Sequence, residues 1–228
     1  MKKLLIICAA LFVSFNTFAQ FKFLSNNTSN EYNAKLFVAD CNDGHCEGKA
    51  TVILYDKISG DDIQTFHSAD LDFNLTAKQD ARIGWIDLGK YQSPLILGDF
   101  NFDGFEDVAI RNGNNGAYAS PSYDVYLAGK DRKFILDKNL TKLAGENLGM
   151  FGIDRKKKEI STEQKSGCCY HQTTSYAFDA KKGLIEVGSV IEDSSIGDDV
   201  TVITQRLIGG KMQKNVKKFK AKDYYAEQ

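Results

Sequence analysis

The segment TVITQRL, residues 201–207, largely alternates apolar with polar side chains, and β-branched residues dominate it. Successive side chains of a strand point to opposite faces of a sheet, so this alternation is typical of a strand with one buried face. Turn residues such as those of 113–116 and 209–210 separate runs of this kind. The pattern predicts a mainly β fold, an antiparallel sandwich or barrel-like single domain, with one short helix near 137–145. The β-branched and aromatic runs lie at 34–39, 50–56, 69–75, 94–98, 107–111, 123–128, 173–179, 184–192, 199–207 and 211–219.

The first 19 residues have the parts of a secretory signal peptide. Lys2 and Lys3 precede an apolar run at 4–15, and Thr17-Phe18-Ala19 ends in the small residues that a signal peptidase reads. We expect cleavage near Ala19 and a periplasmic or secreted mature chain. The apolar run is too short to span a bilayer comfortably, and no later stretch is apolar enough to insert, although an uncleaved anchor remains the alternative.

After the signal peptide, residues 20–32 are polar and rich in Asn and Ser. This composition predicts a flexible N-terminal lead, followed by a single β-rich domain over residues 33–228. The whole chain has 29 basic and 30 acidic residues, and two lysines leave with the signal. The resulting slight negative charge argues against nucleic acid or an anionic membrane as the partner.

Four of the five cysteines lie in the expected mature chain, an even number that suits an oxidising compartment. Cys41 and Cys46 enclose a four-residue polar turn between two apolar runs, so we expect them to pair across a hairpin tip. Cys168 and Cys169 then pair as sequence neighbours, next to a flexible Gly167. The three pairings that four cysteines allow stay open at this point.

A zinc site is the alternative for these cysteines, with His45 and His171 as further ligands. The spacings are not those of a zinc finger, and exported cysteines are usually oxidised. The disulfide hypothesis is therefore favoured.

The segment DFNFDGFED, residues 99–107, concentrates oxygen-bearing side chains in a short turn. They fall at loop positions 1, 3, 5 and 9, and Gly104 at position 6 permits a sharp turn. Calcium takes about six to eight oxygen ligands from such a segment. The predicted Ca²⁺ ligands are the side chains of Asp99, Asn101, Asp103 and Asp107 and the carbonyl of Phe105.

The flanks of this loop are strand-like, and Ile110 stands where an EF-hand needs an acidic residue. We therefore expect a strand–loop–strand calcium site. A metal-free turn is the alternative, because Asp, Asn and Gly favour turns without any metal. Three aspartates within nine residues repel one another unless a cation holds them, which favours calcium.

The loop sequence resembles the calcium loop of integrin-type FG-GAP repeats, although a single copy argues against their β-propeller. A longer series of segments, at 98–111, 113–116, 121–127 and 166–171, resembles a family of periplasmic, lysozyme-inhibitor-like immunity proteins. These proteins protect bacteria from lysozyme-like toxins that secretion systems deliver. The resemblance runs from about Phe37 to Tyr176 and implies a β-rich fold with bound calcium and no catalysis.

Members of that family plug the target's cleft with a loop of the form Ser-Gly-x-x-Tyr, which Ser166, Gly167 and Tyr170 match here. The resemblance implies a lysozyme-like glycosidase or a lytic transglycosylase toxin as the partner. A lysozyme cleft carries two carboxyl groups, to which Ser and Tyr hydroxyls can hydrogen-bond, and a protonated His171 could add a charge-assisted contact. The alternative is a surface turn with a structural disulfide and Tyr170 packed in the core.

Two other classes of function remain. The three histidines lack a recognisable nucleophile context and no phosphate-binding loop occurs, so a hydrolase is less favoured and we expect no enzyme activity. A cell-envelope glycan-binding or adhesion module is the stronger alternative, because Trp85, Tyr118, Tyr123 and Tyr126 could stack on sugars. Aromatic residues in strands are more often core residues or cross-strand pairs.

Overall fold

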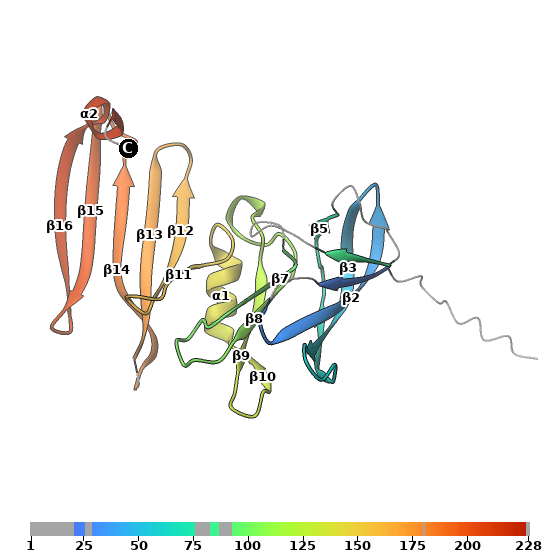
Figure 1. Ribbon diagram of the computed structural model, residues 1–228. Helices are drawn as coiled ribbons and strands as arrows, with labels where there is room; N and C mark the ends of the chain where they lie inside the picture. The colour runs from blue at the N-terminus through green and yellow to red at the C-terminus, as the bar shows by residue number, and fades with distance from the viewer. Residues whose placement is uncertain (1–20, 26–28, 76–82, 87–92, 180, 227–228) are drawn as a thin grey trace, which may run out of the picture.

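The computed structural model of the protein describes residues 21–25, 29–75, 83–86, 93–179 and 181–226, with only the backbone of 83–86. The signal peptide expected at residues 1–19 lies outside these ranges. Within them the chain forms three β-sheets, two α-helices and one 3-10 turn (Figure 1). None of the described helices is long and apolar enough to cross a membrane.

The first sheet has the strand order β4-β3-β2-β1-β6, and β5 pairs with β3. All its pairings are antiparallel except that of β1 with β6, which is parallel. The strands are β1 (Phe21–Ser25), β2 (Tyr32–Asn42), β3 (His45–Asp56), β4 (Asp62–Ser68), β5 (Phe73–Asn74) and β6 (Ile83–Ile86).

The second sheet has the antiparallel order β10-β9-β8-β7. The short helix near 137–145 is confirmed as α1, which begins after Asp137, whose side chain accepts a hydrogen bond from the backbone N–H of Leu140 at 2.8 Å. The elements are β7 (Leu95–Gly98), β8 (Asp107–Arg111), the 3-10 turn η1 (Ala117–Ala119), β9 (Tyr123–Ala128), β10 (Phe134–Leu136) and α1 (Lys138–Glu146).

The third sheet is an antiparallel meander in which each strand pairs with the next along the chain. Long strands joined by short turns favour this connectivity, since sequential hairpins need no crossover. The elements are β11 (Gly152–Asp154), β12 (Glu159–Ser166), β13 (Tyr170–Asp179), β14 (Gly183–Asp193), β15 (Asp199–Ile208), β16 (Lys211–Lys220) and the terminal helix α2 (Ala221–Ala226).

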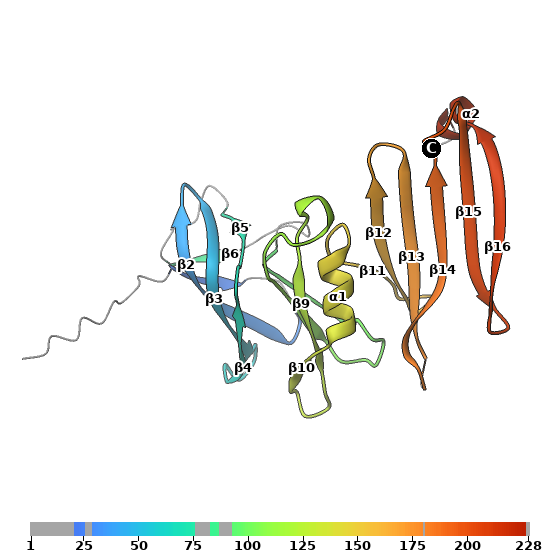
Figure 2. The same cartoon turned by 180° about the vertical axis from the view of Figure 1, so that it is seen from behind.

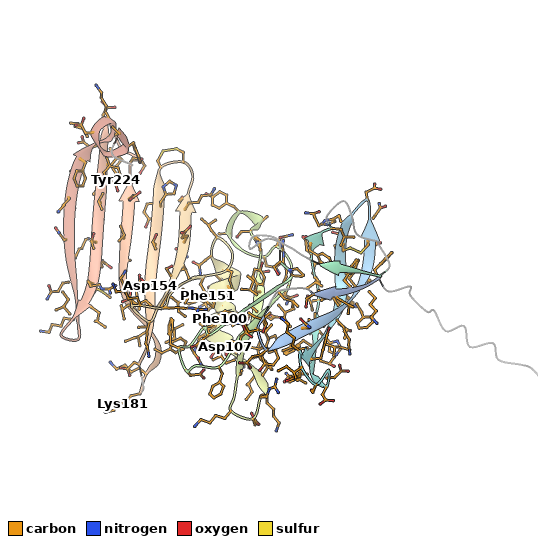
Figure 3. All side chains as sticks on the ribbon, viewed as in Figure 1. Phe100, Asp107, Phe151, Asp154, Lys181 and Tyr224 are labelled. Atoms are coloured by element: carbon orange, nitrogen blue, oxygen red, sulfur yellow. A yellow bond between two sulfur atoms is a disulfide. The ribbon has the colours of Figure 1, made fainter. Side chains whose placement is uncertain are left out.

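The second sheet and α1 lie between the other two sheets, and both views of the ribbon show this layering (Figures 1 and 2). Alternate residues of β8 serve two cores: Val108 and Ile110 pack toward the first sheet, and Ala109 packs toward α1 and the third sheet. All five residues of β8 are buried for this reason. Phe100 and Phe151 meet edge to face in the second core, at 5.6 Å between ring centroids (Figure 3).

The mainly β, antiparallel sandwich expected from the sequence is confirmed, and the strand orders are those of open sheets. The expectation of a flexible lead over residues 20–32 is wrong for residues 21–25, which form β1. Phe23 of β1 is fully buried and packs edge to face on Phe73 at 5.6 Å. The polar residues around 29–31 gave the whole segment a polar composition, so this short apolar run was not recognised as a strand. Its alternate residues face the first core.

The predicted strand at 69–75 is also largely wrong, because only Phe73–Asn74 form β5. The preceding residues are held as a loop by polar contacts to the segment after β8. The carbonyl of Asp70 accepts a 2.6 Å hydrogen bond from the N–H of Gly113, and Asp72 accepts a 2.6 Å hydrogen bond from the amide of Asn114. These contacts replace strand pairing at this point.

Candidate functional site

The hairpin between β12 and β13 presents residues 166–170 at its tip. Ser166 and Tyr170 are the last cross-strand pair, and Gly167 turns the chain with a φ of 64°, a left-handed conformation that glycine adopts without steric cost. A disulfide joins Cys168 to Cys169 in this turn. The segment from Ser166 to Cys168 is exposed. Figures 1 and 2 show the turn at the same end of the third sheet as α2.

Cross-strand partners share a face of the sheet, whereas the next pair lies on the opposite face. Ser166 and Tyr170 therefore share one face, and the next pair, Lys165 and His171, lies on the other. The sequence resemblance groups Ser166, Gly167, Tyr170 and His171 in one inhibitory loop. The structure divides them between the two faces of a wedge, one bearing hydroxyl groups and one bearing nitrogen groups.

Tyr170 is half-buried, and its hydroxyl donates a 2.9 Å hydrogen bond to the side-chain oxygen of Gln172. It belongs to neither hydrophobic core, which counts against the alternative of a tyrosine packed in the core. The carbonyl of Cys169 accepts a 2.8 Å hydrogen bond from the backbone N–H of Ser194, in the neighbouring β14–β15 turn. This contact ties the hairpin tip to the adjacent turn and reduces the conformational freedom of the exposed residues.

The loop at 99–107 joins β7 to β8 and is closed by its own backbone. Asp99 accepts hydrogen bonds from the N–H groups of Asp103 and Gly104 at 3.1 and 3.0 Å. The amide of Asn101 donates to the second carboxylate oxygen of Asp103 at 2.9 Å, and the first accepts from the N–H of Phe105 at 2.9 Å. Side-chain oxygens thus gather on one short loop, as the sequence predicts.

Asp107 lies at the inner end of this loop and is fully buried. Its two oxygens accept hydrogen bonds from the backbone N–H groups of Phe100, at 2.7 Å, and Ala128, at 2.8 Å. Burial raises the pKa of Asp107 to about 7, the hydrogen bonds oppose that rise, and the carboxylates of Asp103 and Asp99 add to it. The structure therefore brings Asp99 and Asp103 close enough to Asp107 for their charges to act on it.

The predicted ligands do not all converge on one point. Among the described residues, no three His, Cys, Asp or Glu side chains are placed to hold a metal ion together. The donor chemistry of the loop, carboxylate and amide oxygens with one carbonyl, suits a hard cation, but most of these oxygens are engaged with backbone N–H groups. The calcium site therefore stays a prediction.

The tip between β2 and β3 carries the other disulfide, and the expected pairing of Cys41 with Cys46 is confirmed. The two residues are register partners with their Cα atoms 4.0 Å apart. The four cysteines among the described residues lie in disulfides, and a disulfide sulfur is not a thiolate ligand, which counts against the zinc alternative. His45 instead contacts the side-chain oxygen of Asn74 at 2.9 Å.

The aromatic residues proposed for sugar stacking do not form one platform. Tyr123 is buried, and Tyr126 packs partly against the first core, so neither ring face is free for a glycan. Tyr118 is exposed, whereas the side chain of Trp85 lies outside the described atoms. Of the three tyrosines proposed for stacking, the structure thus leaves only Tyr118 accessible.

An open depression of about 410 Å³ lies on the first sheet, with Thr51 and His67 in its wall. The ring of His67 is 3.4 Å from the hydroxyl of Thr51, at the outer limit of a hydrogen bond. His67 is exposed, and the contact resembles an ordinary cross-strand pair, because the two residues are register partners in β3 and β4. It carries no argument for catalysis.

Comparisons with known proteins give a likeness of fold. The chain is similar to a solved chain described as "Structure of a Xanthomonas Type IV Secretion System related protein", with a TM-score of 0.65 and 19% sequence identity. The match covers 88% of this chain and 94% of that chain. No protein-family model matches the sequence, and no curated protein matches it.

Proposed function

We propose that this protein is an exported, non-catalytic inhibitor that binds the active cleft of a lysozyme-like peptidoglycan-cleaving enzyme. The observation that carries the proposal is the β12–β13 hairpin tip. Its Ser166 and Tyr170 hydroxyls share one face of a narrow wedge, and the turn between them is exposed and closed by a disulfide. A wedge of this form suits a cleft that is lined with two carboxyl groups.

The physical case rests on preorganisation. The Cys168–Cys169 disulfide and the hydrogen bond from Ser194 to Cys169 limit the freedom that the tip would otherwise lose on binding. In the free protein the hydroxyl of Tyr170 donates to Gln172, and in a complex it would donate to a carboxylate of the partner instead. A charged acceptor makes a stronger hydrogen bond than an amide oxygen does, so this exchange favours binding.

The cellular setting is part of the proposal. The N-terminal signal pattern supports export, and the sequence resemblance supports a periplasmic immunity role against a secreted toxin. The similar Xanthomonas structure belongs to a protein related to a type IV secretion system, and a toxin delivered by such a system would be a fitting target. A toxin that cleaves peptidoglycan acts in the periplasm, so a protein that inhibits it must be located there.

Calcium binding at the 99–107 loop is the second part of the proposal, with a stabilising role. Phe102 of the loop packs against Phe178 of β13 at 6.5 Å between ring centroids. Phe178 is eight residues along β13 from Tyr170, which corresponds to about 26 Å of strand. A cation there would hold the β7–β8 loop against the third sheet without touching the inhibitory tip.

The test measures muramidase activity of several lysozymes and lytic transglycosylases in the presence of the purified mature protein. We expect inhibition with a stoichiometry near one for at least one enzyme, and co-elution of the two proteins on gel filtration. Binding to purified peptidoglycan in the absence of any enzyme is measured in parallel. If the protein binds none of these enzymes but does bind peptidoglycan, the glycan-binding module is the better explanation.

A further inference from the structure

Tyr118 connects the middle layer of the molecule to the hairpin tip. It lies in η1, in the segment between β8 and β9, and its hydroxyl oxygen accepts a 2.8 Å hydrogen bond from the backbone N–H of Gly167. The two residues are 49 positions apart in the sequence. The ring of Tyr118 also lies under the ammonium group of Lys165, which is 4.7 Å from the ring centroid. One side chain therefore contacts both the turn and the last cation of β12.

The backbone that presents Tyr118 is strained. Tyr118 and Ala119 have φ angles of 57° and 56°, a left-handed conformation that costs a residue with a Cβ roughly 1–2 kcal/mol. Hydrogen bonds to one buried residue hold this segment, since the carbonyl of Asn147 accepts from the N–H of Ala117 at 3.0 Å and from the hydroxyl of Ser120 at 2.9 Å. The arrangement is therefore maintained at a cost.

Burial of Tyr118 in the core does not compensate for this strain, because its side chain is 60% exposed. A strained segment that displays an exposed aromatic ring is more readily explained by binding than by stability. Tyrosine is also among the residues that contribute most to protein–protein binding. Because this ring lies next to the proposed inhibitory tip, it would contact the same enzyme that the tip binds.

We infer that Tyr118 and Lys165 form the second, cationic face of the inhibitory wedge. Tyr118 positions Gly167 and holds the ammonium group of Lys165 beside the tip, while Ser166 and Tyr170 present hydroxyl groups on the opposite face. The inference rests on the proposed function. It adds that the partner's cleft is acidic on both walls, with one wall meeting hydroxyl groups and the other meeting a positive charge.

Charge complementarity supports this partner. Carboxyl groups on both sides of the scissile bond are general in glycosidase clefts, so a wedge with a fixed cation on one side matches such a cleft better than a neutral wedge does. The ammonium group held over the aromatic ring keeps its positive charge available to a partner. Because its side chain is already ordered, it loses less conformational freedom on binding. His171 of β13 lies on the same face as Lys165, and Glu192 of β14 is its register partner there.

The first experiment needs no partner. In Tyr118→Phe the ring remains but the acceptor for Gly167 is lost, so amide hydrogen exchange at Gly167, measured by NMR, should speed up about tenfold or more, because an exposed turn amide without an acceptor is poorly protected. The amides of β14 and β15 should exchange as in the wild type. Unchanged exchange at Gly167 would overturn the positioning role of Tyr118.

The second experiment uses the enzyme that the wild-type protein inhibits best. Tyr118→Ala and Lys165→Met should each weaken the Kd by about tenfold, and Lys165→Arg should restore most of the affinity. Lys165→Met should also reduce the dependence of Kd on salt, because one ion contact is lost. The matched control is Lys181→Met, an exposed lysine at the opposite end of the third sheet (Figure 3), which should bind like the wild type.

The outcomes separate the two levels of the argument. If the wild-type protein inhibits no enzyme, the proposed function fails. If the wild-type protein inhibits and both Tyr118→Ala and Lys165→Met bind as tightly as Lys181→Met, the proposed function stands and the cationic face is refuted. Circular dichroism and melting temperatures near the wild-type values confirm that the variants are folded.

Discussion

The carboxylate of Asp107 accepts a 2.7 Å hydrogen bond from the backbone N–H of Phe100, seven residues earlier in the chain. This contact closes the β7–β8 loop over a fully buried acid, and the second oxygen of that acid reaches the N–H of Ala128 on β9. The carboxyl group of Asp107 thus joins the loop to the middle sheet. Because this group titrates, the stability of the metal-free protein should depend on pH.

With calcium removed by a chelator, the protein should be more stable at about pH 5 than at about pH 7.5. The pKa of Asp107 is about 7 when folded against 3.8 ordinarily, so the folded state binds the proton more tightly. The contribution is fully present below about pH 4 and is lost as the pH rises to 7, so at most about 3 kcal/mol of stability, at 1.4 kcal/mol per pH unit, disappears between the two pH values. Urea unfolding at the two pH values measures it.

Asp103→Asn is the matched variant for this measurement. It removes a neighbouring negative charge, which should lower the pKa of Asp107 and make the loss of stability between the two pH values smaller. His45, whose pKa is raised mainly by its hydrogen bond with Asn74, titrates alike in both proteins and cancels in the comparison. Identical pH dependence in the two proteins would show that Asp107 does not behave as described.

Calcium should raise the melting temperature of the wild-type protein, and more strongly at about pH 7.5 than at about pH 5.5, where Asp107 is protonated. A ligand at a hundredfold excess over its Kd adds about 2.7 kcal/mol to the free energy of unfolding. For a chain of this size that corresponds to a shift of roughly 5–10 °C. Asp103→Ala should abolish the shift and Asp131→Ala, in a turn outside the loop, should keep it. A wild-type melting temperature that chelator leaves unchanged would rule out the calcium site.

Phe23→Ala should destabilise the protein by about 3–5 kcal/mol, since it leaves a cavity beside Phe73 in the first core. Ile58→Ala, at a side chain that is 97% exposed, should change the free energy of unfolding by less than about 0.5 kcal/mol. Chemical denaturation measures both. Equal effects of the two substitutions would mean that β1 is not part of the core.

The sequence predicted the parts of this fold that local patterns encode. Alternation in segments such as 199–207 and the N-capping Asp137 before an apolar helix face are local, and the structure has a strand and a helix there. The strand β12, with the sequence EISTEQKS, escaped prediction because its outer half is exposed on both sides and shows no apolar alternation. Its pairing with β13 holds it in the sheet.

For the candidate site too, only the parts that are contiguous in sequence were predictable. The Ser-Gly-x-x-Tyr form and the acidic loop are contiguous in sequence, so their residues could be named in advance. Tyr118 could not be, because its contact with Gly167 spans 49 residues and depends on how the second sheet packs against the third. Tyr118 follows the glycine-containing turn at 113–116, and this position gives no local signal of that contact.

The two disulfides should differ in what they do. The denatured, unreduced protein should contain no reactive thiol in its mature chain. Cys41→Ser with Cys46→Ser should cost about 2–4 kcal/mol of stability, because Cys46 is fully buried in the first core. Cys168→Ser with Cys169→Ser lies in an exposed turn and should leave the melting temperature nearly unchanged while weakening inhibition. Thiol titration, thermal melting and inhibition assays measure the three effects, and two or more free thiols in the wild type would contradict the pairing.

Tyr170→Ala should weaken binding to the inhibited enzyme by about 2 kcal/mol, or roughly thirtyfold in Kd, because it removes the largest side chain on the hydroxyl face of the wedge. Ser166→Ala removes one hydrogen bond and should cost only about 1 kcal/mol, or roughly fivefold. Both variants should melt like the wild type, since Ser166 is exposed and Tyr170 lies outside both cores. Calorimetric titration and muramidase inhibition give the Kd values, with Lys181→Met as the control. Undiminished inhibition by Tyr170→Ala would show that the enzyme is bound by another surface, because no other side chain of the tip could replace a buried tyrosine in the cleft.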